Sequence, residues 1–198
     1  MENKEPILYI FSGLPASGKS TLAINLSKIL KIVYIRIDTI EQGIMDLCKF
    51  NVQGEGYRLA YRIIEDNLKI GNDVISDQCN PINLTRNEFN NLAIKNDCKY
   101  LNIEIICSNE TEHKKRVESR NNPPSWNEVM KRKYDTNYSF MYYEPWEEEH
   151  IIIDTANKTI EECTKELLDK IKNEWYSFLF CFFDIIQIYN LRRPYGTE

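Results

Sequence analysis

The chain has few of the residues from which zinc sites are built. Its 198 residues include six cysteines, no two of which form a Cys-x-x-Cys pair, and two histidines, His113 and His150. Structural zinc sites need closely spaced Cys and His ligands, so the composition argues against one. We expect free thiols rather than a metal centre or a disulfide framework.

Marks of secretion, membrane insertion and disorder are also missing. The polar segment Met1 to Pro6 has no basic start followed by a long apolar run, which a secretory signal needs. Apolar residues make up 42% of the chain and charged residues 28%, an ordinary globular balance. With no internal repeat and no flexible linker, we expect one main domain, without a transmembrane segment, in the cytoplasm.

A surplus of basic residues is lacking as well. The 25 Lys and Arg residues stand against 30 Asp and Glu residues, so the formal net charge is −5. General nucleic-acid binders usually carry a basic surplus, and this balance weighs against such a role. A local basic channel stays compatible with the composition.

Apolar runs alternate with helical patterns along the chain. The continuous run Ile7 to Phe11 predicts a strand buried on both faces. Further strands are expected at 32–37, 73–76, 100–107 and 150–154, and helices at 21–30, 39–50, 57–70, 80–95, 111–120, 125–140 and 159–175. This alternation predicts an α/β fold, a parallel sheet with helices on both faces. Ligands of such sheets bind at the carboxyl ends of the strands.

A glycine-bearing loop separates the first strand from the first helix. Its sequence, Gly13-Leu14-Pro15-Ala16-Ser17-Gly18-Lys19-Ser20, matches the pattern G-x-x-x-x-G-K-[ST] in full. Backbone amides of such a loop and the helix N-terminus form an anion site. We predict that these residues and Thr21 bind ATP. Lys19 is expected at the β- and γ-phosphates and the Ser20 hydroxyl on Mg²⁺.

Two carboxylates follow predicted strands. Asp38 comes after the second strand, where it is placed to take the proton of an acceptor hydroxyl or to orient that hydroxyl. The alternative for Asp38 is a helix N-cap. Asp77 ends the third strand, where a carboxylate can hold Mg²⁺ or contact the acceptor, and a loop cap is the alternative there.

Positive charge gathers after the fourth strand. Seven Lys and Arg residues stand against two acidic residues between His113 and Lys133, whereas residues 144–174 contain ten acidic residues and four lysines. Arg116 and Arg120 share one face of a predicted helix, so both could stabilise a transferring phosphoryl group. Arg132 is a weaker candidate. The alternative reading is a solvated charged helix.

Together these motifs resemble the small P-loop kinases. The resemblance rests on the loop, Asp38, the run Ser76-Asp77-Gln78-Cys79-Asn80, Thr85-Arg86 and Arg116-x-x-x-Arg120. The group includes AAA_33-type kinases, gluconate and shikimate kinases, chloramphenicol phosphotransferase, adenylylsulfate kinase and the polynucleotide kinase domain. The resemblance covers about residues 7–172 and implies a three-layer P-loop fold with sheet order 2-3-1-4-5. It also implies ATP-Mg²⁺ as donor, Thr155 near the adenine, and acceptor-side positions for Asp77, Asn80 and Arg86.

One position departs from the polynucleotide kinases. They carry an arginine three residues after the aspartate, which reads the acceptor phosphate, and this chain has Glu41 there. A carboxylate repels a phosphate. The favoured function is therefore an ATP-dependent kinase acting on a hydroxyl of a small molecule. The alternatives are a 5′-hydroxyl kinase of RNA or DNA ends and a nucleotide-binding interaction protein without catalysis.

A strongly apolar segment follows the predicted kinase fold. We expect a kinase domain over residues 1–175 and an apolar extension over 176–198. The extension is shorter than the roughly 20 residues of a membrane span, and Asp184 interrupts it. Three roles are possible for this extension: an extra helix packed on the sheet, a homodimer or partner surface, or a segment at a membrane interface.

Overall fold

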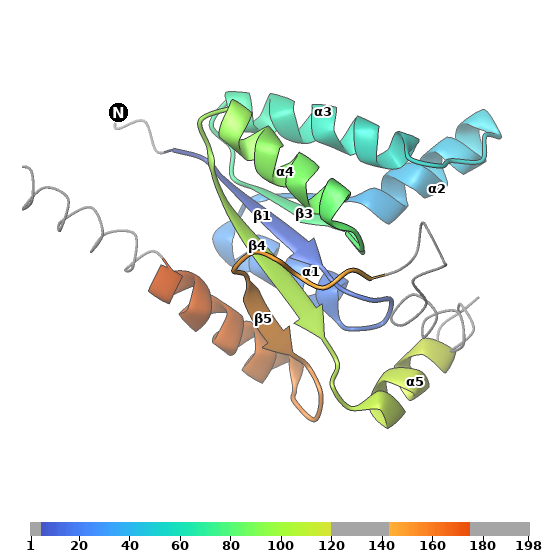
Figure 1. Ribbon diagram of the computed structural model, residues 1–198, viewed down its shortest axis with the longest axis vertical. Helices are drawn as coiled ribbons and strands as arrows, with labels where there is room; N and C mark the ends of the chain where they lie inside the picture. The colour runs from blue at the N-terminus through green and yellow to red at the C-terminus, as the bar shows by residue number, and fades with distance from the viewer. Residues whose placement is uncertain (1–4, 120–142, 175–198) are drawn as a thin grey trace, which may run out of the picture.

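Five parallel strands form one sheet in the order β2-β3-β1-β4-β5, as the sequence analysis predicted (Figure 1). The computed structural model describes residues 5–119 and 143–174. The strands are β1 (Ile7–Ser12), β2 (Val33–Arg36), β3 (Val74–Asp77), β4 (Lys99–Ile106) and β5 (Ile151–Asp154). The helices are α1 (Lys19–Leu30), α2 (Ile37–Cys48), α3 (Glu55–Lys69), α4 (Asn83–Lys95), α5 (Glu110–Glu118) and a C-terminal helix over 160–174.

Helices cover both faces of the sheet and make two separate cores. Tyr9 and Phe11 of β1 pack with α1 and the C-terminal helix, whereas Leu8 and Ile10 pack with α3 and α4. The alternation follows from the two-residue period of a strand. All six residues of β1 are buried, which explains why its sequence is a continuous apolar run.

The parallel register brings three strand ends to one level. Asp77 at the end of β3 pairs with Phe11 of β1 on one side and Arg36 of β2 on the other. The residues that follow these strands therefore meet at the same edge of the sheet, where ligands of open α/β sheets bind.

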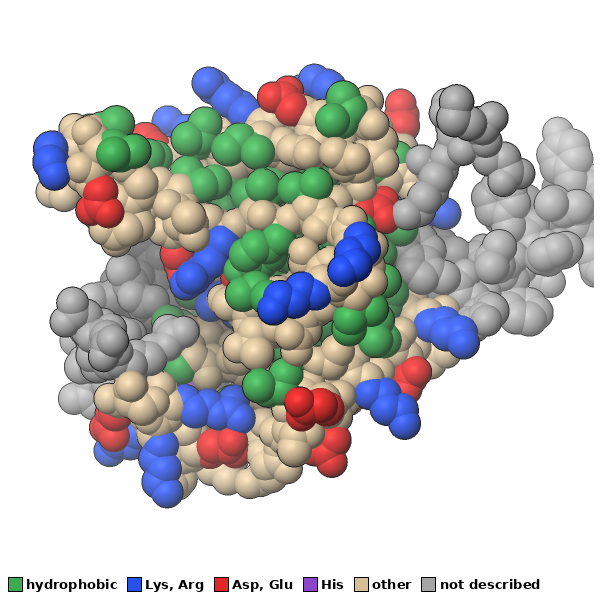
Figure 2. Space-filling model, turned by 180° about the vertical axis from the view of Figure 1, so that it is seen from behind, with side chains coloured by type: hydrophobic (Ala, Val, Ile, Leu, Met, Phe, Trp, Pro, Cys, Tyr) green, Lys and Arg blue, Asp and Glu red, His purple; other side chains and the backbone are tan. Residues whose placement is uncertain are grey.

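The surface of the described residues mixes charges of both signs. Figure 2 shows acidic and basic side chains interspersed over the face of the molecule opposite to that in Figure 1. Within residues 5–119 and 143–174, no helix has the length and apolar character needed to cross a bilayer. The expected helix 125–140 and the apolar extension 176–198 lie outside the described residues.

Two element boundaries differ from the sequence expectations. β2 ends at Arg36 and α2 begins at Ile37, so Asp38 lies in the first turn of α2 rather than ahead of it. α4 begins at Asn83, so Pro81 precedes the helix and does not occupy its first turn. The Asn83 backbone N–H donates to the Glu144 carboxylate over 2.6 Å. This contact between distant segments explains why local sequence misplaced the start of α4.

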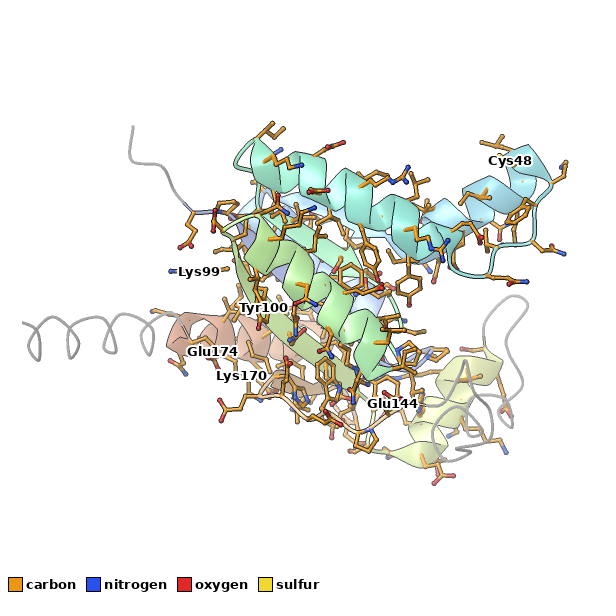
Figure 3. All side chains as sticks on the ribbon, turned by 45° about the horizontal axis from the view of Figure 1, so that its top comes forward. Cys48, Lys99, Tyr100, Glu144, Lys170 and Glu174 are labelled. Atoms are coloured by element: carbon orange, nitrogen blue, oxygen red, sulfur yellow. The ribbon has the colours of Figure 1, made fainter. Side chains whose placement is uncertain are left out.

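Residues 143–150, here called the strap, run from the start of α4 to β5. The Glu144 backbone N–H donates to the Pro81 carbonyl over 2.8 Å, and the Asn90 amide of α4 donates to Glu148 over the same distance. Figure 3 shows Glu144 near the beginning of α4. The strap thus ties α4 to the sheet.

Arg86 of α4 holds the strap in place. Its guanidinium is buried and lies over the rings of Tyr143 and Trp146, 5.0 and 4.1 Å from their centres. A guanidinium has five N–H donors, and each of the five has a partner here. The acceptors are the carbonyls of Asn80, Pro81, Glu144 and Pro145 and the side chain of Asn83. Arg86 therefore joins the loop after β3 to the strap.

His150 fastens the other end of the strap. Its Nε2 lies 3.1 Å from Glu104 of β4, and its ring stacks on Trp146 with centres 4.2 Å apart. Burial lowers the pKa of His150, but hydrogen bonds to Glu104 and to the Glu148 carbonyl outweigh this, and the net pKa is raised. For Glu104, burial raises the pKa, and bonds from His150 and Tyr143 bring the net value below the ordinary one.

The His150–Glu104 pair makes folding stability depend on pH. A raised histidine pKa gives stabilisation that is complete below the unfolded value of about 6.5 and is lost as the pH rises through the folded value. We expect His150→Gln to cost about 1 kcal/mol at pH 6 and clearly less at pH 9. Urea unfolding of both proteins at the two pH values measures this. An equal cost at both would show that His150 acts through packing alone.

Candidate nucleotide and acceptor site

The loop after β1 can be formed only with glycine at its two ends. Gly13 has φ +145° and Gly18 has φ +100°, both in the region that favours glycine. A Cβ at Gly13 would collide with the Ile105 carbonyl oxygen, and one at Gly18 would lie 3.3 Å from Thr155. The Gly13 N–H donates to the Cys79 carbonyl over 3.1 Å, which joins this loop to the one after β3.

Helix α5 supports the middle of the loop. His113 is buried, and its Nε2 donates to the Pro15 carbonyl over 2.8 Å. Ala16, at φ 62°, packs against Val117. Within the loop, the Ser17 N–H donates to the Leu14 carbonyl over 3.2 Å. The sequence analysis did not single out His113, and nothing short of knowing that α5 packs on the loop would have identified it.

Lys19 begins α1 at the end of the loop. It is 6% exposed, and its ammonium makes no hydrogen bond or ion pair with the residues that the structure describes. Ser20 and Thr21 follow it in the first turn of α1. An ammonium that has no partner among the described residues and lies at a helix N-terminus favours an anion, so the helix start has the properties of a phosphate site.

Thr155 links the loop to the basic helix. Its hydroxyl donates to the Ser17 carbonyl over 2.8 Å and accepts from Arg116 over 2.8 Å. Arg116 also donates to the Thr155 carbonyl and pairs with Glu112 at 2.6 Å. Thr155 and Arg116 border a pocket of about 460 Å³. Its remaining lining includes Gly18, Thr21, Lys158, Thr159, Ile160 and Cys163.

The Lys158 to Cys163 wall of this pocket was not predicted. It begins three residues after Thr155, so the rule that ligands gather beyond strand ends could have suggested it. Arg120, expected beside Arg116, and Arg132 lie outside the described residues.

Asp77 is a buried carboxylate with one free oxygen. It is 1% exposed, and its Oδ2 accepts from the Tyr34 hydroxyl over 2.6 Å. Its Oδ1 has no hydrogen-bond partner. Burial, followed by the bond to Asp77, raises the pKa of Tyr34. Tyr34 and Arg36 alternate along β2, and Arg36 Nε lies 4.0 Å from Asp77, so both residues border this carboxylate.

Asp38 also pairs with Arg36. Its carboxylate lies 2.8 Å from Arg36 and is 54% exposed. The N-cap position of α2 is Arg36 rather than Asp38, and no side chain caps that helix end. The capping alternative for Asp38 is therefore not adopted, and its carboxylate remains open to solvent.

Asn80 connects the loops on the acceptor side. It is fully buried with φ 49°, and its amide donates to Ser12 over 3.1 Å. Its backbone N–H lies 3.4 Å from the Tyr57 hydroxyl of α3. Arg86, in contrast, holds the Asn80 carbonyl and has no donor left for a ligand. All five donors of Arg86 are used within the protein, which gives it a structural role, and its expected acceptor-side position stays a prediction.

The donor set of the site suits Mg²⁺ better than a transition metal. The free Asp77 Oδ1 and the Ser20 hydroxyl are hard oxygen ligands, and Mg²⁺ commonly uses one or two of these beside phosphate oxygens and water. Among the described residues, no three His, Cys, Asp or Glu side chains gather into a metal site of their own.

The fold and the loop are those of a small P-loop kinase. A gluconokinase from Sinorhizobium meliloti 1021 superposes with a TM-score of 0.65 at 13% identity, covering 89% of this chain and 98% of that one. An APS kinase of Mycobacterium tuberculosis, in complex with AMPPNP and APS, gives 0.63 at 13% identity, covering 85% and 98%. At these identities the likeness establishes the fold.

The sequence comparison defines the family. Residues 7–176 match the family model of the chromatin associated protein KTI12, and the chain belongs to this family. It is also 30% identical over 182 residues to an L-seryl-tRNA(Sec) kinase of Methanococcus maripaludis, covering 85% of this chain and 67% of that protein.

Thr155 offers a conservative test of the pocket. Thr155→Val keeps the shape and removes the hydroxyl that joins Ser17 to Arg116, so we expect ADP to bind about tenfold more weakly. Calorimetric titration with ADP measures the affinity, and thermal unfolding checks the fold. Thr155→Ser, which retains the hydroxyl, should bind as the wild type does. Unchanged affinity in Thr155→Val would place the nucleotide elsewhere.

Proposed function

We propose that the protein is an ATP-dependent kinase that transfers the γ-phosphate to a hydroxyl of a small molecule. The observation that carries the proposal is the pairing of two features at one sheet edge. The P-loop presents Lys19, which has no partner among the described residues, and Asp38 lies in the first turn of the helix that follows β2. Kinases among the relatives and fold neighbours support this reaction class.

The P-loop side would hold the donor. Loop amides from Gly13 to Ser20 and the α1 N-terminus would bind the phosphates, with Lys19 at the transferring end. The pocket beside Thr155 would take the nucleoside. Arg116 is held at that pocket by Thr155 and Glu112, and its charge would stabilise phosphate oxygens.

Ser20 and Asp77 would hold Mg²⁺. The unpartnered Asp77 Oδ1 supports this assignment, since a buried carboxylate oxygen without a donor is costly. Bound there, the ion would neutralise phosphate charge and orient the triphosphate.

Asp38 would act on the acceptor. The hydroxyl oxygen attacks the γ-phosphorus, its proton passes to the Asp38 carboxylate or to solvent, and the bond to the β–γ bridging oxygen breaks to release ADP. Arg36 pairs with Asp38 over 2.8 Å and orients its carboxylate.

A second candidate acceptor is the hydroxyl of an amino acid carried on tRNA. The 30% identity to the L-seryl-tRNA(Sec) kinase over 85% of this chain favours it. The mixed charges in Figure 2 give no broad basic surface on that face of the described residues, so such an acceptor would need a local contact.

Replacing Asp38 tests the chemistry. We expect Asp38→Asn to lower acceptor-dependent kcat by roughly 10²-fold or more while ATP affinity stays within about twofold. A coupled ADP-release assay against a panel of alcohols and aminoacyl-tRNA, with titration of ATP, measures both. Full turnover in Asp38→Asn would remove its assigned role.

Lys19 tests the donor site. Lys19→Ala should weaken ATP binding by roughly tenfold or more and abolish transfer, because an unpaired ammonium is lost where phosphate charge is greatest. Lys28, at the other end of α1, serves as the control position, and Lys28→Ala should bind ATP normally. ATP binding without any transfer in the wild type would favour the non-catalytic alternative.

A further inference from the structure

Glu41 is a half-buried carboxylate without a partner on the acceptor side. It lies one turn after Asp38 in α2, and it makes no hydrogen bond or ion pair in the described structure. Carboxylates are rarely taken out of water unpaired, because desolvation disfavours their charged form. The position therefore lacks a positive partner within the protein.

Packing fixes the Glu41 side chain. Gly56 of α3 lies so close that a Cβ there would overlap the Glu41 side chain, with its Oε1 at 2.8 Å. Gly56 has no positive φ, so its lack of a side chain serves the approach of the two helices rather than a turn. Glu41 is thus held in place between α2 and α3.

The charges around Glu41 are negative. Burial raises its pKa first, and the neighbouring carboxylates of Asp38 and Glu55 raise it further. The nearby cation, Arg36, is already shared between Asp38 and Asp77. No cation of the described chain compensates Glu41.

An unpartnered buried atom on the same side is also an acceptor. Asn80 Oδ1 is buried and has no donor among the described residues, whereas the unpartnered Asp77 Oδ1 is the atom assigned above to Mg²⁺. Asn80 reaches the Tyr57 hydroxyl, and Tyr57 lies in the field of both Glu41 and Asp38. A ligand that satisfies this side of the site must bring donors of hydrogen bonds.

Space for the rest of a ligand lies beside Tyr57. A groove of about 590 Å³ runs between the start of α3 and the length of α4. Gly54 and Tyr57, on either side of Gly56, line it together with Tyr61 and the cations Arg58 and Lys95, whereas Asp38 and Glu41 lie outside its lining. Its volume lies within the range of small-molecule sites.

We propose that the acceptor is an alcohol bearing an ammonium group, which Glu41 binds while Asp38 receives the hydroxyl. This inference rests on the proposed kinase function. Residues three apart on a helix lie on one face, so the two carboxylates bracket neighbouring nitrogen and oxygen atoms of an amino alcohol. The body of a larger acceptor occupies the groove beside Tyr57. A phosphate-bearing acceptor is repelled by Glu41.

Three alcohols of similar size and different charge test the proposal. They are 2-aminoethanol, ethylene glycol and glycolate, with transfer followed by ADP release and binding followed by NMR saturation transfer in the presence of ADP. We expect kcat/KM for 2-aminoethanol to exceed that for ethylene glycol by about tenfold, and glycolate to be the poorest acceptor.

Substitutions at Glu41 provide the decisive comparison. Glu41→Gln should abolish the preference for the ammonium, and Glu41→Arg should reverse it toward glycolate. Asp46→Asn is the matched control, since Asp46 lies exposed on the same helix and bonds only Gln42, and it should keep the wild-type order.

Each outcome separates this proposal from the kinase function. Transfer that ignores acceptor charge, or a preference that survives Glu41→Gln, overturns the role of Glu41 and leaves the kinase intact. Glu41-dependent binding of 2-aminoethanol without transfer supports the site and overturns the kinase. Absence of both binding and transfer for all three alcohols overturns the ammonium site, and ADP release with the wider panel of alcohols and aminoacyl-tRNA then decides the kinase function separately.

Discussion

The backbone contact around Gly13 determines the rest of the site. The Ile105 carbonyl of β4 lies so close to Gly13 that no side chain fits at this residue, and the Gly13 N–H donates to the Cys79 carbonyl after β3. The hydrogen bond from Gly13 to Cys79 sets the position of the phosphate loop relative to the loop that carries Asp77 and Asn80. Parallel pairing of β1 with β3 and β4 makes this approach possible, since all three strands end at one edge. Donor and acceptor sides are therefore positioned by one constraint.

Arg86 extends that constraint to the far side of the loop. Its guanidinium binds the carbonyls of Asn80 and Pro81 and those of Glu144 and Pro145, so a single buried cation joins the acceptor loop to the strap. Burial lowers the pKa of Arg86, and nearby Tyr143, Glu104 and Glu144 oppose this. A buried cation of this kind is tolerated because every donor has a partner. The same network includes the His150–Glu104 pair through Trp146. The same network of contacts therefore stabilises the strap and positions Asn80.

The sequence predicted features that depend on local patterns and missed those that depend on contacts between distant segments. The loop and the strand run Ile7 to Phe11 followed from motif and period, because those signals lie within short windows. The five-strand order was implied by the resemblance to the small P-loop kinases. The structural role of Arg86 could not be read from local sequence, because its partners Glu144 and Pro145 come from a segment nearly sixty residues away. His113 escaped notice because only the packing of α5 on the loop brings it to Pro15. The start of α4 depends on Glu144 in the same way.

Charge is divided between the two sides of the site rather than spread evenly. Lys19 and Arg116 border the phosphate loop, whereas Asp38, Glu41 and Asp77 gather around β2, β3 and the start of α2. The net charge of −5 conceals this division. A polyanion is attracted to the first side and repelled by the second, so a triphosphate has one favourable orientation. Every alcohol presents the same hydroxyl to Asp38, and the phosphate loop cannot distinguish one acceptor from another. The Glu41 carboxylate therefore provides the discrimination among acceptors. Selectivity must come from the group beside that hydroxyl, and the protein offers it a fixed negative charge.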